Sequence, residues 1–426
     1  MQGKIHLLWL ILIAAGSAAI PTAGKAQGAL VTHFEHAKQF DPLFQAAHAE
    51  RNANLVSSNL ARTALLPQLQ INSSRLETES SQRTTATVVQ PLVDANRFAT
   101  YQEGEPREII ANATFQAREQ DLALRYFKAV SEVVRNRESL SLNKAQIESF
   151  DQQARSAKRA FELGTGTVTD LRDAQVRLDQ ARATDIRLRA LLLAAERQFY
   201  AMTGRLPPDQ AFSLARRPLQ VALGKPEESL SRAAQNNPQL VASRQNERIA
   251  DLAITRAKGA FLPTVNVTAT RTHSSRFSDS YVGVQISIPL QASTFLQVSA
   301  ANANAAQASY QTDALAQRTQ LEVQRLRDLV EAGRSEIAFR LQSIESAELS
   351  VEANEKSFRG GVRSKLDVIN SIQILYQVKQ EHLEAVLALA DHFLQLNMQL
   401  AMPVFDSLEQ VENLLFETQT TLLGQK

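Results

Sequence analysis

His33 and His36 are the closest pair of histidines in the chain, and their spacing of three residues would place both side chains on one face of a helix. Two imidazoles on one helical face could supply two ligands to a metal ion such as zinc. A protein zinc site needs at least a third protein ligand, and His48, the next histidine, lies well downstream on a separate turn. We therefore expect these histidines to have a surface or core role, and we predict no metal site.

Side chains that attack substrates covalently are poorly represented in this sequence. The 426 residues include no cysteine, which excludes a thiol nucleophile, a disulfide bond and a lipid-modified cysteine at the N-terminus. The chain also lacks the Gly-x-Ser-x-Gly segment of serine hydrolases and a glycine-rich loop of the type that binds phosphate. The sequence therefore predicts a protein that is not an enzyme and holds no cofactor.

Two aspartates each follow a glycine at the same short distance. The two segments read Gly164-x5-Asp170 and Gly361-x5-Asp367. A glycine readily adopts the left-handed conformation that ends a helix. Oxygen-bearing side chains just beyond it, at Thr169 with the first aspartate and at Ser364 with the second, can accept hydrogen bonds from the free N–H groups of a new helix. The simplest interpretation is two tight turns between pairs of helices.

These two turns are part of a longer internal repeat. The matching residues are Pro42 and Pro238, Pro67 and Pro263, and Gly164 and Gly361. Their separations are 196, 196 and 197 residues, so the register is kept from one end of the repeat to the other. We predict a tandem duplication of a helix-strand-strand-helix unit, with repeats at residues 27–220 and 221–426.

Long segments without glycine or proline predict long helices. Neither residue occurs between Pro106 and Gly164, and only Gly333 interrupts the segment between Pro289 and Gly360. As one helix, the second segment would be roughly 100 Å long, a length that requires coiled-coil or bundle packing. The expected long helices cover residues 107–163, 169–203, 292–358 and 365–402.

Four shorter segments alternate apolar and polar residues, which is the pattern of β-strands. They cover residues 68–76, 84–92, 264–272 and 281–289. Strands of about ten residues with one apolar face are typical of an outer-membrane barrel wall, but a closed barrel needs about eight of them. Because an open sheet edge is not tolerated in lipid, several copies of the chain would have to pool their strands. The alternative is a soluble sheet that caps a helical bundle.

The N-terminus predicts export from the cytoplasm. Lys4 and His6 precede an apolar run at residues 7–15, and residues 24–26 fit the small-x-small rule for cleavage of a signal peptide. The apolar run is well short of the roughly 20 residues of a membrane-spanning helix. We expect residues 1–26 to be a signal peptide.

The charges of the chain are nearly balanced. There are 46 lysines and arginines against 44 aspartates and glutamates, and loss of Lys4 and Lys25 with the signal peptide would leave 44 of each sign. A nucleic-acid-binding protein would need a clustered basic face. We therefore expect no nucleic-acid partner.

The segments with the most specific patterns are residues 161–181 around the first turn, 358–370 around the second, Ile288-Pro289-Leu290 and 389–403. Taken in this order, they resemble the TolC family of outer-membrane channel proteins, and the resemblance covers nearly the whole chain after the signal peptide. It implies a mainly α-helical protein with a membrane β-barrel portion. Three copies in a homotrimer would each supply four strands to a twelve-stranded barrel in the outer-membrane lipid of a Gram-negative bacterium. Long helices would form a hollow cylinder through the periplasm.

The resemblance also implies that the two turns lie at the periplasmic entrance of a pore. Asp367 matches one position of an acidic ring that constricts the pore, and Asn370 stands at the position of a second acid in the best-known family member. Three copies of Asp367 around an axis would attract cations and repel anions. Gly164 and Gly361 match the turns where the hairpins of adaptor proteins dock.

A latch in the family joins an aspartate of the first turn to a tyrosine and an arginine of the second. Asp170 and Arg363 match it, but Phe358 stands at the tyrosine position and lacks the hydroxyl group. We therefore expect a latch that rests on Asp170 with Arg363. Asp173 lies three residues after Asp170 on the same helix face, and we expect it on the outer helix pair.

The resulting functional hypothesis is a passive exit duct for type I secretion or efflux. Its partners would be a periplasmic adaptor (membrane-fusion) protein and an inner-membrane ABC or RND-type pump. The alternative is a periplasmic coiled-coil adaptor or scaffold without a pore. The strand pairs favour the duct, because an adaptor needs no lipid-facing alternation. The choice between protein secretion and small-molecule efflux stays open, with a lean toward secretion.

Overall fold

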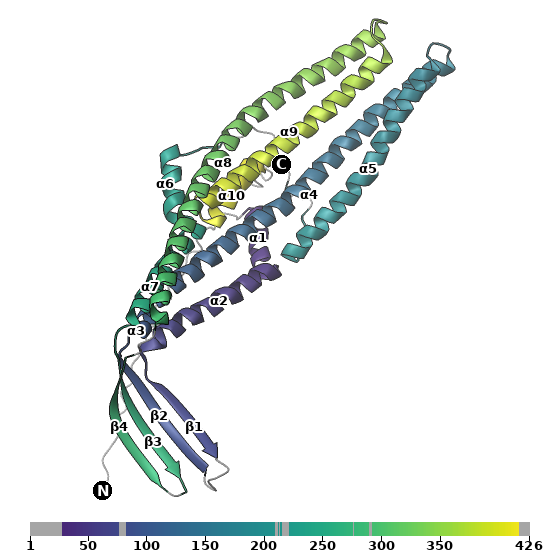
Figure 1. The fold of residues 1–426 in the computed structure, drawn as a ribbon. Coiled ribbons are helices and arrows are strands. Elements are labelled where there is room, and N and C mark those ends of the chain that lie inside the picture. Colours follow the sequence, from purple (N-terminus) through teal and green to yellow (C-terminus); the bar gives the residue numbers. More distant parts are fainter. Residues whose placement is uncertain are drawn as a thin grey trace, which may run out of the picture.

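The computed structural model describes residues 28–75, 82–208, 212, 214, 221–275, 277–288 and 292–416. The chain is elongated, with a four-stranded sheet at one end and the turns of two long helical hairpins at the other (Figure 1). The expected signal peptide, residue 76 of the first expected strand and residue 289 of the fourth lie outside the described residues.

All four expected strands form one antiparallel sheet. They are β1 (Gln68–Arg75), β2 (Gln82–Val93), β3 (Thr264–Ser274) and β4 (Ser278–Ser287), in the order β1-β2-β3-β4. The central pair joins the two halves of the chain, and Thr87 lies opposite Thr270 with their hydroxyl oxygens 3.3 Å apart. Within the described residues, β1 and β4 are edge strands that each have a partner on one side only.

One face of the sheet has exposed apolar side chains. Val282 and Ile286 of β4 are 77% and 65% exposed, and Leu69 and Ile71 of β1 are both 64% exposed. Soluble proteins rarely leave such side chains in contiguous exposed patches, because exposed apolar surface is costly in water. The sheet therefore needs an apolar environment as well as further strands at its edges.

Four long helices make up most of the chain: α4 (Gly104–Glu162), α5 (Val168–Thr203), α8 (Ser293–Arg359) and α9 (Lys365–Gln399). The 67 residues of α8 span roughly 100 Å at about 1.5 Å per residue. Two ends differ from the sequence prediction. α4 begins at Gly104 rather than residue 107, because Pro106 is tolerated in the first turn, where no intrahelical N–H bond is needed. α9 ends at Gln399 rather than residue 402, since Ala401 has a φ of +51°.

Shorter helices lie between the sheet and the middle of the long helices (Figure 1). They are α1 (Ala29–Phe40), α2 (Pro42–Arg62), α3 (Ala95–Gln102), α6 (Pro226–Asn236), α7 (Pro238–Gly259) and α10 (Val404–Leu415). Asp41 and Asn237 are the N-cap residues of α2 and α7 and accept hydrogen bonds from backbone N–H groups. A proline follows each cap at the first helical position, where its fixed φ suits the helix. The repeated pairs Asp41-Pro42 and Asn237-Pro238 thus begin α2 and α7 in the same way.

Two separate cores hold the helices together. The larger one lies about midway along the length of the molecule. It buries Phe34, Tyr126, Phe127 and Phe199 together with leucines of α9 and α10. The smaller one lies toward the hairpin turns. It contains Phe150, Ala154 and Ala157 of α4, Ala174, Leu178 and Ala181 of α5, and Val368, Ile369 and Ile372 of α9. The small core joins the α4–α5 hairpin to α9, so the two hairpins are packed together near their ends.

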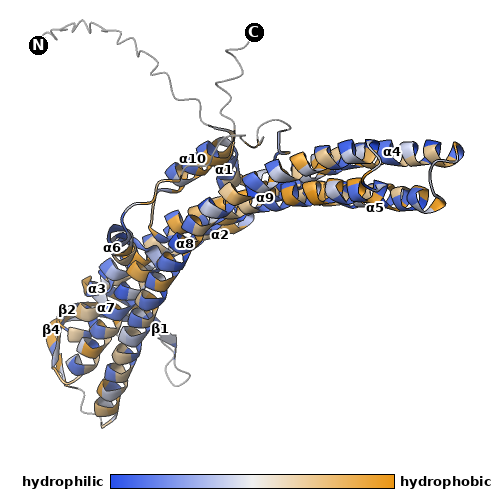
Figure 2. Cartoon of the chain, turned by 90° about the horizontal axis from the view of Figure 1, so that it is seen from above, coloured by the Kyte–Doolittle hydropathy of each residue, from blue (hydrophilic) through white to orange (hydrophobic). Residues whose placement is uncertain are grey.

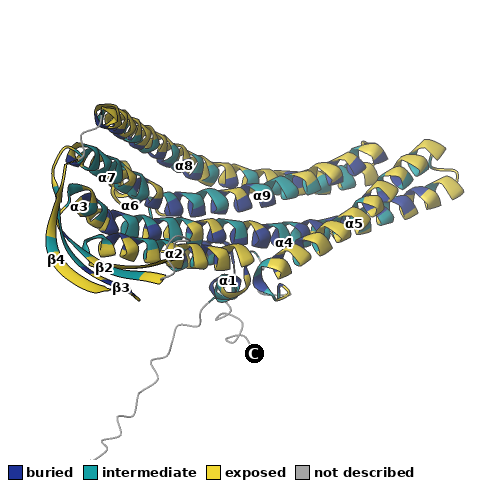
Figure 3. Ribbon diagram, turned by 60° about the horizontal axis from the view of Figure 1, so that its bottom comes forward, coloured by how far each residue is buried: buried dark blue, intermediate teal, exposed yellow. Residues whose placement is uncertain are grey.

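The long helices also keep exposed and apolar faces. Exposed stretches run along α5 and α8 (Figure 3), and orange segments alternate with blue along both hairpins (Figure 2). Phe295, Tyr310 and Phe339 of α8 are 70%, 75% and 69% exposed. Across the described ranges, no helix has the length and apolar character needed to cross a membrane.

Candidate functional site

The two hairpin turns have the same backbone geometry. Gly164 and Gly361 have φ angles of +72° and +75°, and each N–H donates to the carbonyl three residues earlier, on Phe161 and Phe358. A Cβ added to either glycine would meet nothing within 4 Å. Backbone conformation, rather than lack of space, therefore explains why glycine suits both positions. The expectation that each glycine closes a long helix is confirmed.

Each turn leads into a capping box at the start of the next helix. Thr167 Oγ1 donates to Asp170 Oδ2 at 2.6 Å and accepts from the Asp170 N–H at 3.1 Å. Ser364 and Asp367 make the same pair of contacts at 2.8 and 3.2 Å. The expected cap at Thr169 is wrong, because α5 begins one residue before it and Thr167 holds the N-cap position. A capping box pairs the N-cap residue with the residue three positions later. Thr167, and not Thr169, lies three positions before Asp170.

The carboxylate of Asp367 is stabilised in its charged form. The hydroxyl and the N–H of Ser364 donate to it, and with the nearby Arg363 guanidinium they hold the pKa of Asp367 below its usual value. Asn370 lies three residues further along α9 and is exposed. The two residues expected at a pore constriction therefore lie on one side of the helix, with a persistent negative charge on the first.

The expected pairing of Asp170 with Arg363 is not formed within one described chain. In the described part of a single chain, neither a hydrogen bond nor an ion pair joins Asp170 to Arg363. The charge of Arg363 acts instead on Asp367. The ring of Phe358 is occupied by another cation, the Lys365 ammonium, whose nitrogen lies 4.9 Å from the ring centroid. Asp173 is exposed on α5.

Lys365 is a site residue that the sequence reasoning missed. It is only 7% exposed, and its Nζ atom donates to Ser156 Oγ of α4 at 3.0 Å. Burial lowers the pKa of Lys365, while the carboxylates of Asp170 and Glu355 oppose that shift. One signal was available in the sequence: the lysine directly follows an N-cap serine, where the helix dipole disfavours a cation. A residue that breaks a local rule often has a partner elsewhere in the fold.

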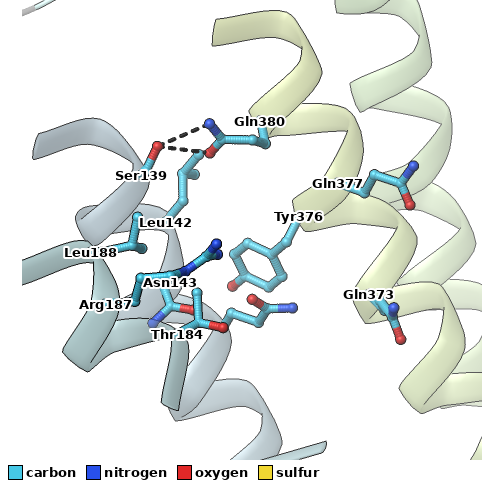
Figure 4. Close-up of a pocket in the computed structure, with 11 residues that line it drawn as sticks. Ser139, Leu142, Asn143, Thr184, Arg187, Leu188, Gln373, Tyr376, Gln377 and Gln380 are labelled. Atoms are coloured by element: carbon cyan, nitrogen blue, oxygen red, sulfur yellow. Dashed lines mark hydrogen bonds between the residues drawn. The ribbon is translucent and has the colours of Figure 1, made fainter. Parts of the chain in front are cut away.

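A polar cavity of about 450 Å³ lies between the hairpins, further from the turns (Figure 4). Its lining includes Ser139 and Asn143 of α4, Thr184 and Arg187 of α5, and Gln373, Tyr376, Gln377 and Gln380 of α9. Ser139 and Gln380 hydrogen-bond across it, with Ser139 Oγ and Gln380 Oε1 3.0 Å apart. Its only ionisable groups are one arginine and one tyrosine, so the cavity offers no acid–base pair near neutral pH.

His33 and His48, near the N-terminus, are partly buried and pack against aromatic side chains. The His33 ring lies 5.6 Å from the Phe199 ring, and burial lowers its pKa. The His48 ring packs against Phe115 at 4.6 Å. Where the structure describes the chain, no cluster of three or more histidine, aspartate or glutamate side chains is arranged to hold a metal ion.

Comparison with known proteins gives consistent matches over the chain. The model of the family described as "Outer membrane efflux protein" matches residues 34–205 and 229–400. The alkaline protease secretion protein AprF of Pseudomonas aeruginosa is 27% identical over 388 residues, which cover 83% of this chain and 80% of AprF. The proteases secretion protein PrtF of Dickeya chrysanthemi is 28% identical over 416 residues, covering 89% and 88%.

The fold is similar to that of a solved channel. A crystal structure of CusC superposes with a TM-score of 0.74 and 15% identity, covering 89% of this chain and 93% of CusC. At this identity the likeness concerns the fold alone.

Proposed function

The chain belongs to the outer membrane efflux protein family, the TolC family, and we propose that three copies of it form one exit duct through the outer membrane and periplasm. As a member of this family it is an outer-membrane protein with a periplasmic extension, and it serves as an exit duct in secretion or efflux. The family comprises transport channels rather than enzymes. The relatives and the family model give no support to a periplasmic adaptor without a pore.

The observation that supports a trimer is the open sheet with its exposed apolar side chains. Strands β1 and β4 have unpaired edges within the described chain, and their apolar side chains are exposed. Each unsatisfied backbone group in lipid costs several kcal/mol, so only a closed barrel is stable there. Pairing β4 of each copy with β1 of the next would close twelve strands, a number within the range of outer-membrane barrels.

The exposed faces of the helices support the same assembly. Phe339 of α8 and Ile186 of α5 are 69% and 71% exposed on opposite hairpins of one chain. Helices of this length bury their apolar stripes against neighbouring helices. Adjacent copies that pack α8 beside α5 would cover both stripes and close a helical cylinder.

Tandem duplication remains our proposal for the origin of the two hairpins. The family model matches two stretches of equal length, since 34–205 and 229–400 each span 172 residues. Both halves contribute two adjacent strands and one long hairpin to the fold. Both hairpins turn at a left-handed glycine that is followed by a capping box.

The cargo that we propose is a secreted polypeptide. The names of AprF and PrtF assign those two proteins to protease secretion. A duct for type I secretion would join a periplasmic adaptor and an inner-membrane ABC pump, since the duct itself has no energy source. The second candidate is small-molecule efflux with an RND-type pump, which is favoured by the family description.

The hairpin turns are proposed as the periplasmic entrance. Three copies of Asp367 would form a negatively charged ring, with three copies of Asn370 one turn further along. Because Asp170 and Arg363 have no contact within one described chain, the latch that we propose joins neighbouring copies. Loss of either side chain, as in Asp170→Ala or Arg363→Ser, should make the channel leakier, and unchanged uptake of a bulky antibiotic in both variants would contradict the latch.

The adaptor is proposed to dock on the same turns. Leu163 and Val362 flank Gly164 and Gly361 and are 77% and 81% exposed. Exposed apolar side chains at the end of a hairpin suit contact with an apolar partner surface. Leu163→Asp and Val362→Asp should weaken adaptor capture in a pull-down, whereas the matched surface change Thr165→Asp should have a smaller effect.

A clean deletion in the native host tests the cargo. We expect the deletion to remove one or a few secreted proteins, with normal tolerance to dyes, detergents and antibiotics, and the intact gene to restore secretion. Broad sensitisation with an unchanged secretome would overturn the secretion proposal and favour efflux. Loss of the secreted proteins together with broad sensitisation would indicate an exit shared by two pumps.

A further inference from the structure

The side chain of Lys365 lies near the turns, at a place where the two hairpins meet. Its ammonium contacts Ser156 of α4 and the ring of Phe358 of α8. Its charge also interacts with Asp170 of α5 and Glu355 of α8. The lysine itself is the first residue of α9. One side chain therefore contacts both hairpins, and its charge acts on carboxylates of both.

This position is unfavourable for a lysine in isolation. Lysine is rarely buried without partners, and a cation at the start of a helix opposes the helix dipole. The hydroxyl, the aromatic face and the two carboxylates compensate for the lost hydration. Two of these four partners, Ser156 and Asp170, belong to the other hairpin. Their part of the compensation exists only while the hairpins stay together.

Other contacts between the hairpins at this level are modest. The apolar core here includes four alanines, which bury little apolar area for each side chain. The nearby hydrogen bond between Ser149 of α4 and Tyr376 of α9 is 3.3 Å long. The buried ammonium group is therefore a polar contact between α9 and α4 that adds to the apolar packing of Phe150 against Val368, Ile369 and Ile372.

We propose that Lys365 is a positioning residue of the entrance, where its ammonium group pins the α8–α9 hairpin to the α4–α5 hairpin and keeps the channel closed at rest. Phe358, without a hydroxyl group, takes part as the aromatic face that binds the cation. The pin acts inside one chain and is distinct from the latch proposed between copies. This inference rests on the proposed function as a channel.

The physical basis is a difference between two states. An interaction that is present when the hairpins are packed and lost when they separate shifts the equilibrium toward the packed state. Without the ammonium group, Asp170 on one hairpin and Glu355 on the other would lose the cation that attracts both, and Glu355 would keep only its 3.8 Å pair with Arg359 on its own helix. Loss of this attraction would favour separation.

The test is the conductance of the intact channel in planar lipid bilayers, with Lys365→Met as the main variant because methionine keeps an unbranched apolar chain. We expect its open probability to rise by roughly tenfold, a factor that corresponds to about 1.4 kcal/mol. The matched control is Lys356→Met, which removes an exposed lysine near the same end of α8 and should leave the open probability unchanged.

Two further variants separate a positioning role from a general packing role. Lys365→Arg keeps the charge and should retain most of the closure. Glu355→Gln, added to Lys365→Met, removes one of the two carboxylates that the lysine attracts and should restore part of the closure. A variant that had merely loosened the fold would not be rescued by this second change, and the thermal stability of the assembled channel provides an independent check on folding.

The outcomes also separate this inference from the proposed function. If neither the unmodified protein nor Lys365→Met forms pores in bilayers, the channel itself is contradicted. If the unmodified protein forms pores of low open probability, and Lys365→Met behaves like Lys356→Met or is more closed, the pin is contradicted while the channel stands. Absence of rescue by Glu355→Gln would likewise contradict the electrostatic mechanism.

Discussion

Glu103 accepts a hydrogen bond from the guanidinium of Arg256, so a carboxylate from the first half of the chain binds a cation from the second half. Glu103 is only 2% exposed, and Arg107 donates to the same carboxylate at 2.7 Å. The three residues lie at the start of α4 and near the end of α7, where the helices approach the sheet (Figure 1). This ion cluster holds the two halves together at the level where the fold changes from helix to strand.

Glu103→Ala should destabilise the protein by about 3 kcal/mol, because removal of one partner leaves two arginines without their buried counter-charge. The value is at the low end of the range for broken buried pairs, since both arginines are partly exposed. Thermal unfolding measures the effect. Glu105→Ala is the control, because its 3.5 Å pair with Arg248 is exposed and should contribute less than about 1 kcal/mol. Equal losses in both variants would contradict the importance of the buried cluster.

Gly361→Ala should weaken the second turn by about 1 kcal/mol, because a residue with a side chain is strained in the left-handed conformation. The neighbouring Gly360 is a matched control. It has a φ of −81°, and a Cβ there would lie 3.6 Å from the closest atom, so Gly360→Ala should be almost neutral. Amide hydrogen exchange in the last turn of α8 and the first turn of α9 measures both. Similar exchange in the two variants would show that backbone strain is not the cause.

Thr167→Ala should destabilise the start of α5 by about 1 kcal/mol, the usual cost of removing an N-cap side chain. Thr169→Ala should be neutral or slightly stabilising, since alanine is the better helix former at a position inside the helix. Faster exchange of the first-turn amides of α5 is expected in the first variant alone. The reverse order would restore the cap that the sequence reasoning assigned to Thr169.

Asp367→Asn should reduce the preference of the channel for cations, and Asn370→Asp should increase it by adding a second charged ring. Reversal potentials in salt gradients measure both. Hydrogen bonds from Ser364 lower the pKa of Asp367, so the selectivity should persist as the pH falls through the ordinary aspartate value and be lost only below it. A selectivity that disappears at or above that value would show that another group carries the charge.

Glu412→Gln should stabilise the protein at neutral pH. Burial raises the pKa of Glu412, and its Oε2 atom has no hydrogen-bond partner, whereas Oε1 accepts from the Leu30 N–H at 3.1 Å. A raised folded-state pKa gives stability that is present below the unfolded value and is lost as the pH rises through the folded value. The gain of the variant should therefore vanish on acidification, whereas Glu331→Gln, an exposed control on α8, should show no such dependence. Thermal unfolding of the two variants and of the unmodified protein, measured as a function of pH, tests this prediction.

Local patterns in the sequence were sufficient for the four long helices and the four strands of this fold, but not for the six shorter α-helices among the described residues. The absence of glycine and proline predicted helices that end within a few residues of those observed, because these two residues act on the backbone where they stand. Period-two alternation placed four strands for the same reason, since adjacent side chains point to opposite faces. The errors at Pro106, Thr167 and Ala401 concern single turns at helix ends, where the choice between two nearby starts depends on one hydrogen bond or one φ angle.

The tertiary structure decided which of these elements meet. Lys365 and Ser156 are 209 residues apart in sequence, and Glu103 and Arg256 are 153 apart. No periodicity relates such residues, because their contact depends on how the hairpins pack rather than on the conformation of either segment. Sequence patterns alone predicted the long helices, the strands and the two glycine turns, together with the resemblance to the family. The pairing of distant charges, and with it the candidate pin between the hairpins, followed only from packing in three dimensions.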